Sequence, residues 1–541
     1  MAAAKHFRGP FRRKPLAHLV GETTGSPHQL RRALGPVQLT LLGVGAIVGA
    51  GLFTTIGSAA AGGDHHVGAG PAVVVSFLFV AVACGFAALC YAEFAAMVPV
   101  SGSAYTYAYA TLGELAAWII GWDLILEYAI SNAAVAVSWS GYFQGLLQAV
   151  FHFQLPAWLS TDITSTARAA ADVAHAQAAH HDLLAKLGPE AHAMAQAWWF
   201  GEVFELQLKP EVVEAAAVFH AAPRLLGVPF IFNLPAFAIV ALVTWVVLIG
   251  IRETARFNTV LVVVKLAILL FFIGLGALYI RPENWANFAP HGFRGISSAA
   301  AIIFFAYIGF DAVSTAAEET RNPKRDMPIG ILASLLICTV LYVAVAVVLT
   351  GMARWDTLGN NEPLAKAFLA LGLNWTAAVV ALGAVIATTS ALVPYQAGQP
   401  RIFFAMGRDG LLPGWAARVH PRFRTPHVTT LITGVIVAAC AAVFNINELV
   451  ELTNIGTLFA FLLVALGIVI LRRTEPDRPR PFRAPLVPWV PLGAIASCAY
   501  LMAQLPWVTW VRFFGWMAAG LLLYVAYGFR RSRLGGAGRK S

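Results

Sequence analysis

Two ionisable side chains lie in stretches that are otherwise almost wholly apolar. Lys265 lies in NTVLVVVKLAILLFF, nine residues beyond Arg256, and Asp311 follows IIFFAYIGF. At ~1.5 Å per helical residue Lys265 is roughly 13 Å from that arginine, near the middle of a bilayer if the segment crosses one. A lysine at that depth faces the protein interior or a wet cavity and can lose and regain a proton near neutral pH. The pattern indicates proton coupling, and equally fits a structural lysine paired with helix carbonyls.

Asp311 ends one of two apolar segments that glycine interrupts. The first segment is LLGVGAIVGAGLF over 41–53, and the second is IIFFAYIGFD over 302–311. A lipid-facing helix gains nothing from glycine, which costs roughly 1 kcal/mol of helix propensity per residue. Paired breaks in corresponding segments are typical of a midplane substrate site in transporters built from inverted repeats. Asp311 would then either bond to freed backbone N–H groups or take part in proton coupling.

The first break suits a carboxylate. The run Gly49-Ala50-Gly51 permits a short unwound stretch. The N–H groups that begin the next half-helix lie at the positive end of its dipole, where an α-carboxylate is favoured. The spacing of Gly45 and Gly49 also fits a small-residue helix-packing face, which is the alternative interpretation.

The second break supplies partners for an amine. Carbonyls released ahead of Gly309 would face the same cavity, and they belong to Phe305, Ala306 and Ile308. In lipid such groups are tolerated only where they line a cavity or bind something. Phe305 and Tyr307 are bulky enough to form a wall over a bound side chain, although both also fit ordinary helix packing.

The composition places these segments in a membrane. Of 541 residues, 59% are hydrophobic and 12% are charged, whereas a soluble domain carries about 25% charged residues. Apolar runs long enough to cross a ~30 Å hydrocarbon core recur along the chain. We expect twelve spans, at about 36–60, 71–98, 113–147, 233–251, 256–280, 296–318, 327–352, 373–406, 427–444, 448–471, 486–506 and 510–529. The sequence therefore predicts an all-α polytopic membrane protein.

The distribution of basic residues predicts the orientation. With the N-terminus in the cytoplasm, 27 of the 37 Lys and Arg residues fall on the cytoplasmic side and 9 on the external side. The positive-inside rule then places both termini in the cytoplasm. The formal net charge of +10 is therefore a signal of membrane topology, and no nucleic acid partner is predicted.

The segment 151–229 is the one long polar interruption, and this topology makes it external. It is rich in Ala and His, with helix-like stretches around 164–187 and 189–204. The adjacent His180 and His181 lack the carboxylate or cysteine spacing of a metal site. We predict solvated helices over the external mouth, with no metal and no cofactor.

Several motifs resemble the amino acid–polyamine–organocation superfamily, and within it the cationic amino acid transporters and their bacterial relatives. The match extends from about residue 28 to 530, outside 151–229, and is carried by GVGAIVGAGLF, GWDLILEYA, FNTVLVVVKLAILL, FFAYIGFDAVSTAAEETRNPKRDMPIGI and GQPRIFFAMGRDGLLP. The resemblance implies a LeuT-like fold, in which two inverted five-helix repeats with unwound first and sixth helices are followed by two added helices.

On that resemblance the chain divides into segments of distinct role. They are a basic cytoplasmic tail at 1–35, a first inverted repeat at 36–280 interrupted by the external segment 151–229, a second inverted repeat at 296–471, two added spans at 486–529, and a basic cytoplasmic tail at 530–541.

The resemblance also implies roles for single residues. The substrate carboxylate would meet the N–H groups of Ala50 and Gly51. The amine would meet carbonyls of four residues, namely Ile47, Phe305, Ala306 and Ile308. Lys265 would reach toward the first helix and the hydroxyls near Thr388 and Thr389, where its protonation would replace a sodium ion. The chain departs from the family in having Ala50 where a hydroxyl residue is common, so a side-chain contact to the substrate is lost.

The residues that select the substrate side chain are less sharply indicated. Asp123 and Glu127 are four apart and share a helix face, and relatives place an acid at Glu127, where it could pair with a cationic side chain or act structurally. Tyr307 and Tyr395 are further candidates, although Pro394 departs from the expected pattern beside Tyr395. Small neutral amino acids such as alanine are slightly favoured over cationic ones.

The sequence thus predicts a transporter in the plasma membrane, the inner membrane of a bacterium, that imports amino acids by alternating access. Its partners would be the amino acid, protons and the lipid bilayer. Coupling to H⁺ symport is favoured, with proton-independent exchange or facilitated diffusion as the alternative. A non-transporting amino acid sensor on the same fold is the rival from another class. No nucleophile and base converge in these spans, so no enzyme is predicted.

Overall fold

The computed structural model describes residues 12–13, 34–63, 66–98, 103–186, 210–249, 254–421, 423 and 425–532. Within these ranges the chain is helical apart from two hairpins of two-residue strands, β1 Gly62–Gly63 with β2 His66–Val67 and β3 Arg224–Leu225 with β4 Val228–Pro229. The expected helix at 189–204 lies outside the described residues, whereas the one at 164–187 is α8, Ile163–Lys186.

Among the described residues, eight helical segments and one bent pair of helices are long and apolar enough to cross a membrane. The eight are Gly70–Met97 (with α5, Val73–Met97), Glu114–Phe151 (α7), Thr259–Tyr279 (with α12, Thr254–Gly276), Gly292–Ser314 (with α13, Gly292–Tyr307), Pro323–Met352 (α14), Asn374–Arg408 (α16), Ile446–Thr474 (α18) and Trp507–Arg531 (with α20, Trp507–Leu523). The bent pair is α2, Pro36–Ile47, with Ala50–Ala61, which consists of α3 Ala50–Phe53 and α4 Thr55–Ala61. The prediction of an all-α polytopic membrane protein is confirmed.

Three shorter apolar helices lie in the other predicted spans. They are α11 Leu234–Ile249, α17 His427–Val443 and α19 Trp489–Ala503. Each of the twelve predicted ranges therefore contains an apolar helix, while the total of twelve crossings and the inverted repeat stay predictions.

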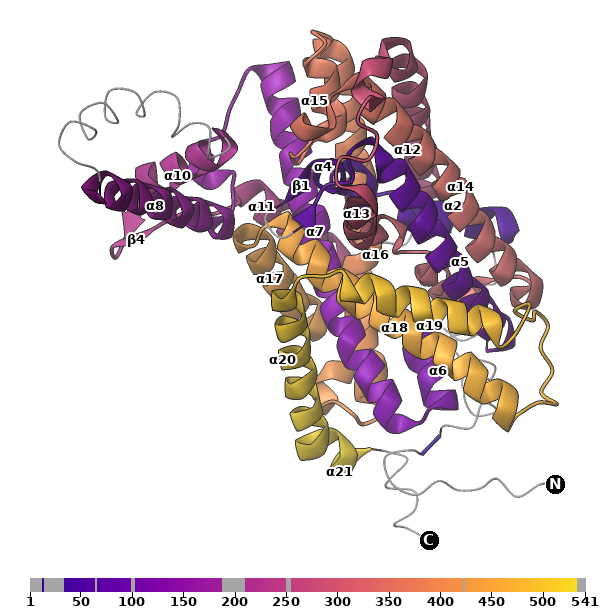
Figure 1. The fold of residues 1–541 in the computed structure, drawn as a ribbon. Coiled ribbons are helices and arrows are strands. Elements are labelled where there is room, and N and C mark those ends of the chain that lie inside the picture. The colour runs from indigo at the N-terminus through magenta and orange to yellow at the C-terminus, as the bar shows by residue number, and fades with distance from the viewer. Residues whose placement is uncertain are drawn as a thin grey trace.

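Helix α7 is the central helix of the bundle. It packs against α16 and α18, while α14 packs against both α2 and α5. Small residues permit these close approaches, because a Cβ on Gly43 of α2 would lie 2.6 Å from the Cβ of Ser334 on α14. The two interrupted segments, α2–α3 and α13, lie inside this arrangement (Figure 1).

The two ends of α7 mark opposite ends of the molecule. At its beginning, the N–H of Glu114 donates to the carbonyl of Arg12 at 2.9 Å, and the Ser532 hydroxyl donates to the Glu114 carboxylate at 2.5 Å. At its other end, after 38 residues, α7 leads into the segment 151–229. Since that length corresponds to about 57 Å, the described residues near both termini lie far from this segment.

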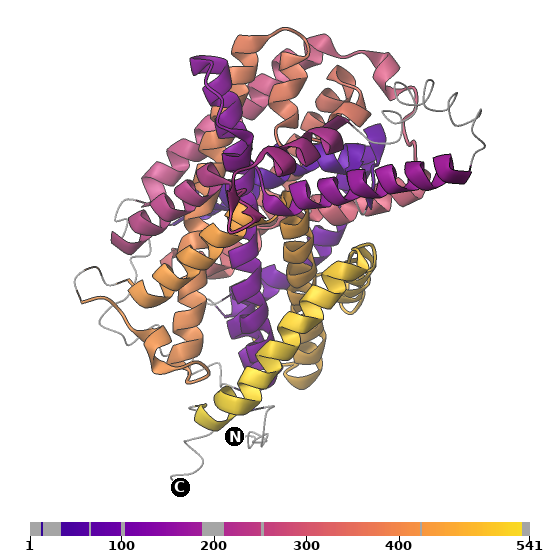
Figure 2. The same ribbon diagram turned by 90° about the vertical axis from the view of Figure 1, so that its left-hand side faces the viewer.

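The described parts of the segment 151–229 include a pair of helices docked on the bundle. Helix α8 packs on α10, Pro210–Ala221, and lies crosswise to α7 in both views (Figures 1 and 2). It is held to the start of α18 by an ion pair of 2.6 Å between Arg168 and Glu448 and by the Thr164 hydroxyl, which accepts the N–H of Asn445 at 3.0 Å. Of the two predicted helices, the one that the structure describes, α8, is therefore fixed to the bundle.

A buried carboxylate ties α5 to the connection between α18 and α19. Glu93 is fully buried and accepts two hydrogen bonds from Arg472, at 2.9 and 2.7 Å, and one from the N–H of Ala484 at 2.8 Å. The Nε of Arg480 lies 3.3 Å from the same carboxylate. Removing one member of a buried ion pair is costly because it leaves uncompensated charge.

Replacing Glu93 by alanine is therefore expected to destabilise the protein by about 3–5 kcal/mol. The measurement is the temperature at which half of the detergent-solubilised protein loses its monodisperse size-exclusion peak. The matched control is Glu475→Ala, since Glu475 is 40% exposed and pairs with Arg478, so only about 0–1 kcal/mol is at stake. Equal shifts for both variants would show that the Glu93 cluster adds no special stability.

Candidate functional site

The first break lies between α2 and α3. Helix α2 ends at Ile47, Val48 is extended, and Gly49 precedes the first residue of α3, Ala50. The two halves differ in direction by 45°. The N–H groups of Ala50 and Gly51 fall in the first turn of the second half, where a helix cannot supply carbonyl partners. These are the N–H groups that the sequence predicts for a substrate carboxylate.

The second break follows α13. This helix ends at Tyr307, Ile308 is extended, and Gly309 has a φ of +122°, a region that favours glycine. The N–H of Gly309 donates to the carboxylate of Asp311 at 3.2 Å. Asp311 begins the 3₁₀ helix η5, Asp311–Glu319, and is 4% exposed. It therefore bonds to the freed backbone, which is one of its two predicted roles.

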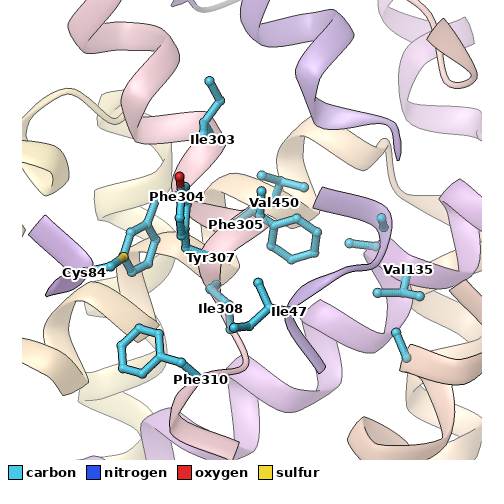
Figure 3. Close-up of a cluster of buried hydrophobic side chains, with 14 of the residues drawn as sticks. Ile47, Cys84, Val135, Ile303, Phe304, Phe305, Tyr307, Ile308, Phe310 and Val450 are labelled. Atoms are coloured by element: carbon cyan, nitrogen blue, oxygen red, sulfur yellow. The ribbon is translucent and has the colours of Figure 1, made fainter. Parts of the chain in front are cut away.

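The two breaks pack directly on each other. A Cβ added to Gly51 would overlap the Cα and N of Ala306, and one added to Gly309 would lie 2.8 Å from the carbonyl carbon of Ala46. Figure 3 shows Ile47 and Ile308 side by side at this crossing. The glycines therefore do more than unwind the helices, because they allow two interrupted backbones to meet.

Lys265 of α12 lies beside the first break. It is completely buried, and its Nζ donates to the carbonyls of Gly45 at 2.6 Å and Val48 at 2.8 Å. Its third partner is the hydroxyl of Ser390 on α16, at 3.1 Å. The expected reach toward the first helix is seen.

The hydroxyl that Lys265 reaches near Thr388 and Thr389 is that of Ser390. The Thr388 and Thr389 hydroxyls donate to carbonyls of their own helix, those of Ala384 and Val385, each at 2.6 Å. Ser390 lies 100° beyond Thr389 around the helix, on the side that faces Lys265.

Two of the predicted residues face different ways. Figure 3 shows Phe305 directed toward Val135 of α7, whereas Tyr307 lies on the Cys84 side, toward α5. The Tyr307 hydroxyl donates to the carbonyl of Phe77 at 3.1 Å. Phe305 thus extends from the second break toward α7, while the contacts of Tyr307 favour a role in holding α13 against α5.

The carbonyl of Ile47 already has a partner. It accepts a hydrogen bond of 2.9 Å from the hydroxyl of Tyr342 on α14. Since a carbonyl oxygen has two lone pairs, this contact leaves capacity for a second donor. No motif in the sequence indicates Tyr342 as a partner, since it lies 295 residues away.

The carboxylates of α7 face α18. Both oxygens of Asp123 and Oε2 of Glu127 have no hydrogen-bond partner among the described residues. A Cβ on Gly456 would lie 2.8 Å from Oδ1 of Asp123, and Glu127 bonds to the Thr457 side chain. Buried polar groups without protein partners are rare in folded proteins, and each calls for a structural or functional explanation.

Tyr395 lies close enough to the carboxyl groups of Glu127 and Asp311 to feel their charge. Tyr395 of α16 packs edge-on against Tyr128 of α7 with ring centroids 5.7 Å apart. Glu127 and Tyr395 both interact electrostatically with Asp311 and with each other. The structure thus gathers these residues near the second break.

Comparison with known proteins agrees with this geometry. The model of the amino acid permease family matches residues 34–526. The chain is 42% identical to a branched-chain amino acid permease of Bacillus subtilis, over 97% of this chain and 98% of the relative. It is 40% identical to a methylthioribose transporter of the same bacterium, over 97% and 99%, and 36% identical to mouse cationic amino acid transporter 4, over 86% and 63%.

These matches confirm the resemblance on which the sequence-based predictions rested. The family consists of transporters, which confirms that the chain is not an enzyme. Two helix breaks in contact, a buried lysine on the carbonyls of the first, and a match over nearly the whole chain lead to one assignment: this protein belongs to the amino acid permease family of the amino acid–polyamine–organocation superfamily.

Proposed function

We propose that the protein imports amino acids across the bacterial inner membrane by alternating access, coupled to H⁺ symport. The observation that carries this proposal is the contact between the two breaks, with Lys265 on the carbonyls of the first. The substrate carboxylate meets the N–H groups of Ala50 and Gly51. The amine meets carbonyls at the ends of α2 and α13, those of Ile47, Phe305, Ala306 and Ile308.

Alternating access rests on the family and on an inverted repeat. In this proposal 36–280 and 296–471 are the two repeats, and 486–529 adds two helices. Both termini are cytoplasmic, and the α8–α10 pair covers the external side. The end-to-end separation of the termini from 151–229 along α7 supports opposite sides of the membrane for them.

The preferred substrates are small neutral amino acids such as alanine. The breaks are bordered by buried apolar side chains, those of Ile47, Val135, Phe305 and Val450 (Figure 3). An aliphatic side chain gains about 25 cal/mol per Å² buried there, whereas a charged one loses its hydration. The branched-chain permease among the relatives extends the candidates to larger aliphatic substrates.

Cationic amino acids are the second candidate. Glu127 is buried with one oxygen unpaired, and a carboxylate in that state would stabilise a substrate cation. The similarity to a cationic amino acid transporter points the same way. Tyr395 would line this end of the site.

The uptake experiment separates these candidates. In proteoliposomes with an inward proton gradient, the wild type is expected to accumulate alanine at least about tenfold faster than arginine, a difference of ~1.4 kcal/mol. Glu127→Gln is expected to keep the rate of alanine uptake within about twofold of the wild-type rate. The amide has the shape of the carboxylate, and the alanine side chain carries no charge that would need a carboxylate partner. The readout is the initial rate with labelled alanine, leucine, arginine and lysine.

Other results would choose among the rivals. Arginine uptake equal to that of alanine, lost selectively in Glu127→Gln, would establish the cationic candidate. Uptake by the wild type that ignores the proton gradient would establish a proton-independent exchanger or facilitator. Saturable binding without any flux would establish the amino acid sensor.

A further inference from the structure

The hairpin between α10 and α11 is a well-defined element. Strands β3 and β4 pair antiparallel, with Leu225 opposite Val228, and Leu226 and Gly227 form the turn with φ values of 52° and 84°. The N–H of Phe230 donates to the carbonyl of Pro223 at 2.8 Å, which closes the base. A two-residue turn with both φ values positive is of type I′, which aligns with the twist of the strands.

The residue types in this hairpin do not suit water. Leu226 is 99% exposed, Leu225 66% and Val228 60%. Type I′ turns strongly prefer Asn, Asp or Gly at the position of Leu226, because a leucine at positive φ is strained. Among residues 223–232 only Arg224 is charged. By contrast, the exposed side chains of α8 include Asp172 and His175. Exposed apolar groups that break a local rule indicate a contact with something apolar.

The hairpin is continuous with a surface that faces lipid. Helix α11 begins at Leu234, and its exposed side chains include Leu234, Phe237 and Leu242. Aromatic rings connect the two, since Phe230 stacks on Phe232, and Phe232 packs on Phe237 with centroids 5.3 Å apart. Figure 1 shows the hairpin, labelled at β4, projecting below α8 and outside the helix bundle. Aromatic side chains concentrate where helices enter a bilayer.

We infer that this hairpin inserts Leu225, Leu226 and Val228 into the bilayer interface on its own side of the membrane, the outer leaflet in the proposed orientation. Arg224, which is exposed at the base of the hairpin, binds lipid phosphate groups. The inserted tip anchors the α8–α10 pair to the membrane at a second point, besides its contacts with α18. The inference is independent of which substrate is carried and of how transport is coupled.

The test measures the depth of a spin label. Four of the five native cysteines are buried and Cys440 is half-buried, so a Cys440→Ala chain carrying Leu226→Cys is labelled with a nitroxide and reconstituted in phosphatidylethanolamine–phosphatidylglycerol vesicles. Collision rates with oxygen, which partitions into lipid, and with a water-soluble nickel chelate are measured. We expect the oxygen-to-nickel ratio to be several-fold higher for the label at 226 than for one at Asp172→Cys on α8.

A second pair of variants tests the cause. A label at Val228→Cys is expected to show the same high ratio, and to lose it when Leu225 and Leu226 are both replaced by aspartate. A water-like ratio at 226 would overturn the inference. A label at 226 shielded from both oxygen and nickel would also overturn it, since protein rather than lipid would then cover the hairpin.

Discussion

Replacing Gly51 by valine is expected to abolish amino acid binding, with a loss of apparent affinity of at least about 100-fold, or ~2.7 kcal/mol. A Cβ at this position overlaps the backbone of Ala306, so the two breaks must separate to admit the larger side chain. Overpacking of this kind costs about 1–3 kcal/mol, and here it also moves the N–H groups away from the facing carbonyls. The measurement is the affinity of purified protein for alanine, determined by calorimetry.

A glycine in open surroundings provides the control. Gly274 of α12 would place an added Cβ with nothing within 4 Å, so Gly274→Val should bind alanine with unchanged affinity. Both variants are first checked for a monodisperse size-exclusion peak, so that misfolding is separated from loss of binding. Unchanged affinity in Gly51→Val would mean that the first break serves only helix packing.

The breaks could be predicted because they violate a local rule. Glycine pairs and an aspartate have no place in a lipid-facing helix, so their presence in the two segments pointed to unwound backbone. The structure ends α2 at Ile47 and α13 at Tyr307. The contact between Gly51 and Ala306 could not be predicted, because it depends on how two distant segments cross.

Facing directions were the weakest part of the sequence-based predictions. Phe305 and Tyr307 are two residues apart, which separates them by about 200° around a helix, yet either could have faced the cavity. The same ambiguity applies to the hydroxyl partner of Lys265, since Thr388, Thr389 and Ser390 are consecutive and only tertiary packing decides which one faces α12. Periodicity identifies a face only when polar and apolar residues segregate, and these helices are apolar nearly all round.

Contacts of high sequence separation carried no signal at all. The hydrogen bond from Tyr342 to Ile47 and the ion pair from Arg168 to Glu448 each join residues 280 or more apart. The hairpin at 224–229 could not be predicted either, although its apolar composition is visible in the sequence. An apolar run next to a predicted span cannot be distinguished from that span by sequence alone. Only the geometry of its turn shows that it is a separate hairpin.

The other large effect is expected at Lys265. Its Nζ faces three acceptors, the carbonyls of Gly45 and Val48 and the hydroxyl oxygen of Ser390, whose own proton is donated to the carbonyl of Ala387. An ammonium group has three N–H donors and matches this set, whereas a neutral amine has only two. Loss of the proton therefore removes one of the three donors that bind this set, and an unmade buried hydrogen bond costs about 1–3 kcal/mol. The number of N–H donors on Lys265 therefore links its protonation to the geometry of the first break.

Replacing Lys265 by glutamine is accordingly expected to uncouple transport from the proton gradient. The amide retains two N–H donors for the carbonyls of α2 but cannot gain or lose a proton near neutral pH. Gradient-driven accumulation of alanine should fall at least about tenfold, which corresponds to ~1.4 kcal/mol, while exchange of alanine between the two sides continues. Both rates are measured in the same proteoliposomes, so the loss of accumulation is compared with a flux that requires only substrate binding and movement.

Ser390→Ala distinguishes coupling from mere support of the helix. This variant removes one acceptor of Lys265 but keeps the titratable amine and both carbonyl contacts, so accumulation should persist. Undiminished accumulation in Lys265→Gln would assign the lysine to the structural role that the sequence left open. Loss of both exchange and accumulation would mean that its contacts with α2 are needed for binding itself. If the proton on Lys265 holds the first break in place, Lys265→Gln must lose accumulation while it keeps exchange.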